Sequence, residues 1–505
     1  MVRTRTSAVP AVAVAVGALA ALLPGAAAAS AAPANSPVDA GQYRIAADAE
    51  PVEGSASSAN GGRLAAGKTY TDAIGPEEQL YYSVTLDAKS TAWVSAVAVP
   101  RPGTKVDGND GIELALAAKD GTPCGMTSRV EFDEDNAARP IANHVRRLIQ
   151  PDGECQQAGV YDFTVTREGE ATGGPEDWVL ELRFMEEPPL AKAASTTPPE
   201  PESLPTEQPP PPTAKAEPRT GGTGFNDAVG IDQGVWSDRI KPGDTHFYRV
   251  PLDWGQQLFL TAEFGTTRVT DPSDYASRGV GLDFYDPARG HVGSYAQSYY
   301  GDEPAAAPLG APPIAYENRY QRYLPGIGNT GVAGWYYLAV TVTDEVGEFT
   351  AGGGVPVVLR TTVTGEPKEG PVYDGDAAAA GFGVTDEDRD TAAAGRPADE
   401  DGDGDGAGRT ILAIAGIGAG VVLLAGLGLW TLLARRRAAP GAGPGPGSGA
   451  GPGAGPRVAG EDTRTAPGVY PDGPPQPGGP YGAPQGGQPY GEGYPPPGPQ
   501  QNWRR

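Results

Sequence analysis

Residues 70–87 read YTDAIGPEEQLYYSVTLD, and residues 236–253 read WSDRIKPGDTHFYRVPLD. The second stretch matches the first without a gap, at an offset of 166 residues from position 70 to position 236. A later match joins Ala158-Gly-Val-Tyr161 to Ala333-Gly-Trp-Tyr336. Self-similarity at this distance indicates two copies of one domain.

Each copy has the pattern of a β-sandwich. Short runs of β-branched and aromatic residues alternate with Gly, Asp and Pro turns, and several alternate at period two, as half-buried strands do. In the first copy Tyr82, Val84 and Leu86 share one strand face, which we expect to be core. The sequence therefore predicts an all-β protein with two tandem antiparallel, jelly-roll-like sandwiches, at residues 63–185 and 223–364.

The matched residues also resemble a known family. An aromatic residue, Ser or Thr, Asp, any residue and Ile, then a Pro-containing turn and Tyr-x-Val-x-Leu-Asp, is similar to the bacterial pre-peptidase C-terminal domain. The late Ala-Gly-x-Tyr strand fits it too. The resemblance covers both copies, and it implies an accessory or binding module, sometimes supported by calcium, in an actinobacterial-type surface protein. It supplies no catalytic residues.

The segments outside the two copies have the composition of linkers and of a membrane anchor. Residues 1–31 have a basic start, an apolar run and a small-residue end, which is typical of a secretory signal. Residues 411–434 are uncharged and long enough for one transmembrane helix. Three arginines follow this span, so the positive-inside rule places the tail, 435–505, in the cytoplasm and the N-terminal part outside the plasma membrane.

Three further segments lack the residues needed to build a core. We expect residues 186–222, which are proline-rich, to be an extended spacer between the domains. Residues 365–408 are acidic and rich in Gly and Ala, so we expect a flexible stalk. The Gly/Pro/Tyr-rich tail is expected to be disordered.

Composition limits the partners. The formal net charge is −25, which argues against nucleic acid as a partner, because nucleic acid requires a basic patch. The two cysteines, Cys124 and Cys155, both lie in the part expected to be extracellular, where an oxidising environment favours a disulfide.

Four local patterns could carry chemistry, and each has a plainer interpretation. Gly62-Arg-Leu-Ala-Ala-Gly-Lys-Thr69 fits a phosphate-binding loop, but no strand is expected before it and no helix after it. The stretch 401–406 starts like a calcium loop, but its twelfth position would be Leu412. The stretch 107–111 is a better calcium candidate, although a plain turn is favoured. Asp72 and Asp238 are expected to cap turns.

The histidines do not point to a catalytic or metal site. His144, His246 and His291 are the only three, and none has a metal-ligand partner at short spacing. The position equivalent to His246 holds Leu80, which favours a packing role. We expect no catalytic, cofactor-binding or metal-ligating residues.

The sequence thus favours a non-enzymatic, single-pass membrane protein that displays two sandwich modules for binding or envelope scaffolding, with an envelope protein or glycan as partner. Two alternatives remain open. One is a receptor or secretion-apparatus component that acts through a cytoplasmic partner of the Tyr/Pro tail. The other is an extracellular hydrolase.

Overall fold

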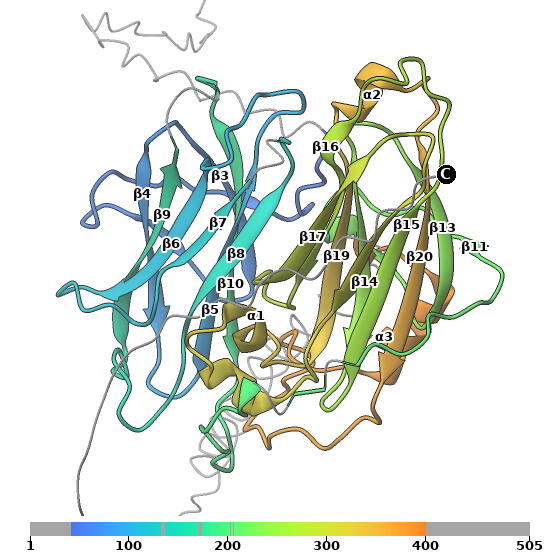
Figure 1. Cartoon of the computed structure of the whole chain (residues 1–505). Coiled ribbons are helices and arrows are strands. Elements are labelled where there is room, and N and C mark those ends of the chain that lie inside the picture. The colour runs from blue at the N-terminus through green and yellow to red at the C-terminus, as the bar shows by residue number, and fades with distance from the viewer. Residues whose placement is uncertain (1–41, 133–136, 170–173, 202–203, 206, 400–505) are drawn as a thin grey trace, which may run out of the picture. The chain divides into compact units, whose positions relative to one another are not determined.

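The computed structural model describes residues 42–132, 137–169, 174–201, 204–205 and 207–399 of the 505-residue chain. The expected signal sequence, transmembrane span and tail lie outside these residues. Within the described part, no helix has the length and apolar character needed to cross a membrane. The described residues are mostly β and form four five-stranded sheets, most of whose strands can be followed in Figure 1.

Module 1, defined as residues 50–187, contains ten strands. They are β1 (Glu50–Pro51), β2 (Gly62–Leu64), β3 (Lys68–Ile74), β4 (Gln79–Leu86), β5 (Thr91–Val99), β6 (Gly111–Ala118), β7 (Ser128–Glu131), β8 (Ile141–Arg147), β9 (Gly159–Glu168) and β10 (Trp178–Glu187). One sheet has the order β1-β3-β10-β5-β8 and the other β2-β4-β9-β6-β7.

Module 2, defined as residues 217–364, repeats this arrangement. Its strands are β11 (Glu217–Pro218), β12 (Val229–Gly230), β13 (Gly234–Ile240), β14 (Thr245–Leu252), β15 (Gln257–Phe264), β16 (Ala276–Tyr285), β17 (His291–Tyr299), β18 (Ala305–Gly310), β19 (Gly334–Val342) and β20 (Val355–Thr364). The sheet orders are β11-β13-β20-β15-β18 and β12-β14-β19-β16-β17.

The helical elements are short. They are η4 (Phe225–Asp227), η5 (Tyr316–Tyr320), α1 (Pro325–Gly328), α2 (Val346–Phe349) and α3 (Asp386–Ala394).

Both modules have the strand order of a jelly roll. When the eight longer strands of module 1 are numbered from 1 to 8 along the chain, one sheet has the order 1-8-3-6 and the other 2-7-4-5. Module 2 has the same two orders. The longer strands pair antiparallel, as expected, but each sheet as a whole is mixed. A strand of two or three residues adds to one edge of each sheet in parallel, as Glu50 beside Tyr70 and Glu217 beside Trp236 illustrate.

The predicted core face is confirmed. Tyr82, Val84 and Leu86 are at most 1% exposed and pack in the core between the two sheets of module 1. Tyr248, Val250 and Leu252 occupy the same places in the larger core of module 2. The shared sequence pattern therefore specifies the same strand in both modules.

The spacer and the stalk are more ordered than their composition indicates. In residues 186–222, Glu187 ends β10, the strand Glu217–Pro218 joins module 2, and the Pro205 carbonyl accepts from Gln257 Nε2 at 2.8 Å. Residues 366–399, here called the C-terminal strap, contain α3 and the buried Phe382. Both polar segments dock on the sheets of the modules, so they need no core of their own.

Candidate functional site: the junction of the two modules

The modules meet through the outer faces of two sheets. Alternate residues of β5, β8 and β10 point away from the core of module 1, and those of β14, β16 and β19 point away from the core of module 2. They join in one buried cluster, whose members include Val97, Val99, Ala142, Val179, Phe247, Tyr285, Tyr337 and Ala339. Phe225 lies at its centre, with ring centroids 5.0–5.2 Å from those of Phe247, Tyr285 and Tyr337.

A buried ion pair flanks this apolar patch. Glu181 of β10 pairs with Arg289, and both side chains are at most 3% exposed. Asn226 Nδ2 donates to Glu181 Oε2 at 2.9 Å, and Arg289 donates to Asn226 Oδ1 at 2.9 Å. Burial alone would lower the pKa of Arg289, but the Glu181 carboxylate outweighs it and raises that pKa. The pair is therefore charged and bound on several sides, as a buried pair must be.

A second buried pair lies at the other end of β10. Arg319 donates to both Glu187 oxygens, at 2.5 and 2.9 Å, and to the Gly331 carbonyl. Tyr373 of the C-terminal strap donates its hydroxyl to the same carboxylate at 2.5 Å. Burial tends to lower the pKa of Arg319, but Glu187 outweighs this and raises it. This site thus joins module 1, module 2 and the strap.

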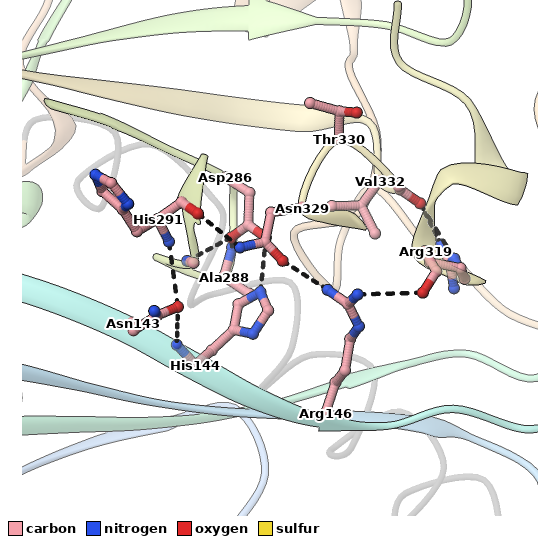
Figure 2. A network of polar contacts seen from close by, with 12 residues as sticks. Asn143, His144, Arg146, Asp286, Ala288, His291, Arg319, Asn329, Thr330 and Val332 are labelled. Atoms are coloured by element: carbon pink, nitrogen blue, oxygen red, sulfur yellow. Dashed lines mark hydrogen bonds and ion pairs between the residues drawn. The ribbon is translucent and has the colours of Figure 1, made fainter. Parts of the chain in front are cut away.

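A third polar contact joins the two modules and is shown in Figure 2. His144 Nε2 lies 2.7 Å from Asp286 Oδ2, and both side chains are at most 2% exposed. The other carboxylate oxygen accepts from the backbone N–H groups of Ala288 and Gly290, at 2.8 and 2.7 Å. A Cβ on Gly290 would lie 2.3 Å from His144 Nε2, so only glycine permits this approach.

Arg146 extends this network toward η5 and α1. Its guanidinium donates to Asn329 Oδ1 at 2.6 Å and to the Arg319 carbonyl at 3.1 Å (Figure 2). Burial lowers the pKa of Arg146 to about 10, partly offset by Asp286. The guanidinium thus stays protonated near neutral pH and links β8 to the loops of module 2.

All three histidines of the chain face an aspartate. Besides His144, His291 Nε2 lies 3.4 Å from Asp283 Oδ1, and His246 Nδ1 lies 2.6 Å from Asp238 Oδ2. Asp238 and Asp283 each lie eight residues before their histidine, on the preceding strand (246 − 238 = 8 and 291 − 283 = 8), whereas Asp286 and His144 lie 142 residues apart. The expected packing role of His246 was incomplete, because its ring is a hydrogen-bond partner.

The Asp238 cluster has a counterpart in module 1 that lacks the histidine. Asp238 accepts from Tyr248 at 2.5 Å and from the backbone of Gly221 at 3.1 Å. Asp72 accepts likewise from Tyr82 at 2.8 Å and from Gly54 at 2.7 Å. Burial raises the pKa of Asp72.

The histidine reverses the pKa direction in module 2. Burial also acts to raise the pKa of Asp238, but the bonds from His246 and Tyr248 lower it to about 2. Each aspartate binds the backbone of a glycine in the segment that precedes its strand, Gly54 or Gly221, and each also fixes a core tyrosine.

The junction leaves a hollow of about 50 Å³ beside these groups. Its lining includes Arg139, Asp244, His246 and Tyr43, whose hydroxyl is buried. An Asp–His pair orients an imidazole for proton transfer. Within the described ranges, the ring of His246 is hydrogen-bonded to Asp238 and to no hydroxyl or thiol.

The other sequence candidates within the described residues have structural roles. Cys124 and Cys155 are joined by a disulfide, with Cα atoms 5.2 Å apart. The residues that fit a phosphate-binding loop lie in β2 and β3 and the turn between them, a strand–turn–strand arrangement. In the calcium candidate, Asp107 accepts from Asn109 and Asp110 accepts from the Asp107 backbone, which makes a self-bonded turn. The second calcium candidate, 401–406, lies outside the described residues.

The C-terminal strap covers one side of the junction. Phe382 packs in a buried cluster with Trp93, Met185, Ala288 and Val332. In α3, Asp388 accepts from the Trp335 indole at 2.8 Å, and Arg389 donates to Asp253 at 2.8 Å. The strap therefore contacts both modules.

Comparison with known proteins yields no family. No family model matches the sequence, and no curated protein matches it, so the resemblance to the pre-peptidase C-terminal domain stays a prediction. Similar solved structures include three with low scores. An arabinose-bound α-L-arabinofuranosidase, MgGH51, has 12% identity over 22% of this chain, with a TM-score of 0.17. This chain spans 18% of that enzyme.

The other two cover more of the chain but score no higher. The tandem CBM22-1–CBM22-2 domain of Paenibacillus barcinonensis Xyn10C has 10% identity over 59% of this chain and 91% of its own, with a TM-score of 0.16. Tripeptidyl peptidase 2 has 8% identity over 60% of this chain and 24% of its own, with a TM-score of 0.17. These values are too low to assign the chain to any of these proteins.

Proposed function

We propose that the chain is a non-enzymatic, single-pass membrane protein that holds two jelly-roll modules outside the cell as one fixed unit. This unit binds an envelope protein or glycan, or it scaffolds an envelope complex. The signal-like start, the uncharged stretch at 411–434 and the arginines after it support the placement in the membrane.

One observation carries the binding role, which is the construction of the junction. Modules that only search for separate ligands need nothing more than a flexible linker. Here the outer faces of two sheets are buried against each other, with the pairs Glu181–Arg289 and Glu187–Arg319 inside. A fixed distance between two surfaces lowers the entropic cost of engaging a partner that touches both. The arrangement thus fits a large partner better than two independent small ligands.

The proposed anchor would keep this unit near the membrane. The described part ends at Asp399, and the expected span begins at Ile411. The residues between them can reach at most about 40 Å when fully extended. A partner within the envelope is therefore more accessible than one beyond it.

Affinity capture tests this proposal. Full-length tagged protein in detergent would be incubated with envelope extract, with and without calcium, beside a variant that lacks residues 438–505. We expect a specific protein or glycan to be captured by both proteins. Capture that disappears with the tail would contradict the proposal in favour of a cytoplasmic role, and the absence of any specific partner would also overturn it.

Protease treatment of intact cells tests the placement. We expect modules 1 and 2 to be cut, or to be released by cleavage after Asp399, while an epitope at the C-terminus stays protected. Survival of the modules while other surface proteins are digested would reject the extracellular placement.

A further inference from the structure

The segment between the two modules carries three consecutive hydroxyl groups that take no part in the junction. Residues 193–201 read AASTTPPEP, so Ser195, Thr196 and Thr197 stand directly before two prolines. All three residues are exposed, and residues 193–200 form neither a helix nor a strand. Proline fixes its own φ and disfavours helical backbone at the residue before it, so the segment is held extended.

This segment is held in place at both of its ends. On one side the Ala191 N–H donates to the Val372 carbonyl of the C-terminal strap at 2.8 Å. On the other side lies the contact between the Pro205 carbonyl and Gln257 of module 2. Ala194 packs against the core cluster of module 2. The three hydroxyl-bearing residues therefore lie in a bridge that is fixed to the folded part and still open to solvent.

The hydroxyls of this bridge have no role in holding the fold. Those of Thr196 and Thr197 make no hydrogen bond to a described residue, and Ser195 Oγ accepts only from the Thr197 N–H, at 3.3 Å. Thr361 is a contrast, because it is fully buried and its hydroxyl donates to the Asp232 carbonyl at 2.5 Å. A bulky group on Thr361 would disrupt the core, whereas a group on the bridge would extend into water.

An exposed bridge of this kind is also the natural place for a protease to cut, because proteases bind extended, accessible backbone. Module 1 precedes the bridge, and the expected span at 411–434 follows it. A cut within residues 193–200 would therefore remove the covalent link between module 1 and its membrane anchor. Bulky groups on the hydroxyls would keep proteases away from this backbone.

From these observations we propose that Ser195, Thr196 and Thr197 are sites of O-linked glycosylation by hexose units, which shield the bridge. Segments rich in Ser, Thr and Pro are typical of O-glycosylated stalks. The inference rests on the extracellular placement in the proposed function, since the bridge must be exported to meet the donor and the proteases.

The modification is a group transfer from a hexose that is bound through its anomeric carbon to a lipid phosphate. The side-chain hydroxyl oxygen attacks this carbon, so that a glycosidic C–O bond forms while the C–O bond to the phosphate breaks. The hydroxyl proton passes to a base of the transferase, and the lipid phosphate leaves with the bonding electrons. A donor held in the membrane suits a chain that is exported across it.

Peptide mass spectrometry of full-length protein, purified from its own source organism, tests the proposal. Trypsin cleaves after Lys192 and Lys215, so the single peptide 193–215 contains the whole bridge. We expect this peptide to carry one or more hexose units, and electron-transfer fragmentation to place them on residues 195–197. Peptide 250–268 is the internal control, because it contains the exposed Thr266 without a neighbouring proline, and it should carry no sugar.

A triple variant separates the modification from folding. Ser195→Ala, Thr196→Ala and Thr197→Ala together should remove the hexose from peptide 193–215. Tm should stay the same, because these hydroxyls make no hydrogen bond to either module. Proteinase K should cut the triple variant at the bridge faster than the wild type, while Thr266→Ala should keep both the sugar and the wild-type rate. An equal rate in the triple variant would overturn the shielding role.

The proposal would be overturned by an unmodified peptide 193–215, by sugar confined to the other hydroxyls of that peptide, or by equal sugar on peptide 250–268. Phosphate in place of hexose would also overturn it. Protease treatment of intact cells reports the placement separately. An unmodified bridge in modules that are cut from outside would overturn the glycosylation alone, whereas modules protected inside the cell would overturn the proposed placement as well.

Discussion

The two modules have the same strand order but bury different outer faces. Module 1 uses the sheet β1-β3-β10-β5-β8, whereas module 2 uses the sheet β12-β14-β19-β16-β17. Every residue of β5 is buried, but its counterpart β15 has partly exposed residues at Thr261 and Glu263. The fold therefore does not decide which face becomes an interface.

Single positions on equivalent strands decide it. Val97 of β5 pairs across the sheet with Glu181, while Glu263 of β15 pairs across the sheet with Val358. Glu181 is fully buried and meets Arg289 of the other module, whereas Glu263 is 41% exposed and meets Arg360 of its own module at 2.8 Å. β5 is apolar and has one compensated charge beside it, so it lies in an interface. β15 carries an exposed charge, so it stays on the surface.

Exchanging the residues at these positions gives the largest expected effect. Val97→Glu would place a carboxylate opposite Glu181 inside the buried junction. We expect the free energy of unfolding to fall by about 4 kcal/mol or more, because an unpaired buried charge is among the most destabilising changes. Chemical denaturation of the full-length protein in detergent measures this.

The reciprocal variant is the matched control. Glu263→Val removes an exposed ion pair and should change stability by less than about 1 kcal/mol. Similar losses in both variants would show that the two faces are equivalent in energy and that these positions do not decide which face becomes an interface.

Much of the fold was readable in the sequence, but the junction was not. The alternation of Tyr82, Val84 and Leu86 identifies a strand with one core face. The same alternation in Trp178–Glu187 has Glu181 and Glu187 on its second face, which looks like a face toward water. Alternation cannot distinguish water from the arginines of another module.

One sequence signal for the junction was overlooked. Residues 91–99 read TAWVSAVAV, which is apolar at almost every position, and continuous runs of this kind are typical of strands buried on both faces. The contact between His144 and Asp286 had no such signal, because the two residues lie 142 positions apart and meet only through the packing of the modules.

Module 1 is also distinguished by its disulfide, and the next largest effect tests it. Cys124→Ser with Cys155→Ser opens a loop with a sequence separation of 31 residues. Loop-closure entropy predicts a loss of about 3–4 kcal/mol. Differential scanning calorimetry should show a lower Tm for the double variant, matched by the wild type under reducing conditions. An unchanged Tm in both would mean that the bond contributes nothing to module 1.

The two aspartate clusters provide a smaller and pH-dependent contrast. His246→Leu gives module 2 the residue that module 1 has at Leu80, which is 5% exposed. Loss of the 2.6 Å contact should raise the pKa of Asp238 and cost about 1–2 kcal/mol at neutral pH. The free energy of unfolding at pH 7 and the acid unfolding midpoint measure the two effects.

The sign of the pH effect differs between the modules. The pKa of Asp238, at about 2, is below its ordinary value of 3.8. Its stabilising contribution is therefore complete well above pH 3.8 and is lost as the pH falls toward 2. The pKa of Asp72 is raised, so protonation favours the folded form as the pH falls through that raised value. If His246→Leu left the acid sensitivity of module 2 unchanged, His246 would not be the cause of the difference.

The smallest effect concerns the C-terminal strap, which follows module 2 and has no counterpart after module 1. Thr385 caps α3: its hydroxyl accepts from the Asp388 N–H at 3.1 Å and donates to the Asp388 carboxylate at 2.7 Å. Thr385→Ala should cost about 1 kcal/mol, felt first as local opening of the helix. Hydrogen exchange should quicken in α3 and around Trp335, whose indole binds Asp388, while β4 and β9 of module 1 keep their rates. Thr385→Ser, which preserves the hydroxyl, should keep wild-type exchange. Quickened exchange in both modules would instead mean that the strap, which contacts both of them, stabilises the whole junction. The strap would then not distinguish one module from the other.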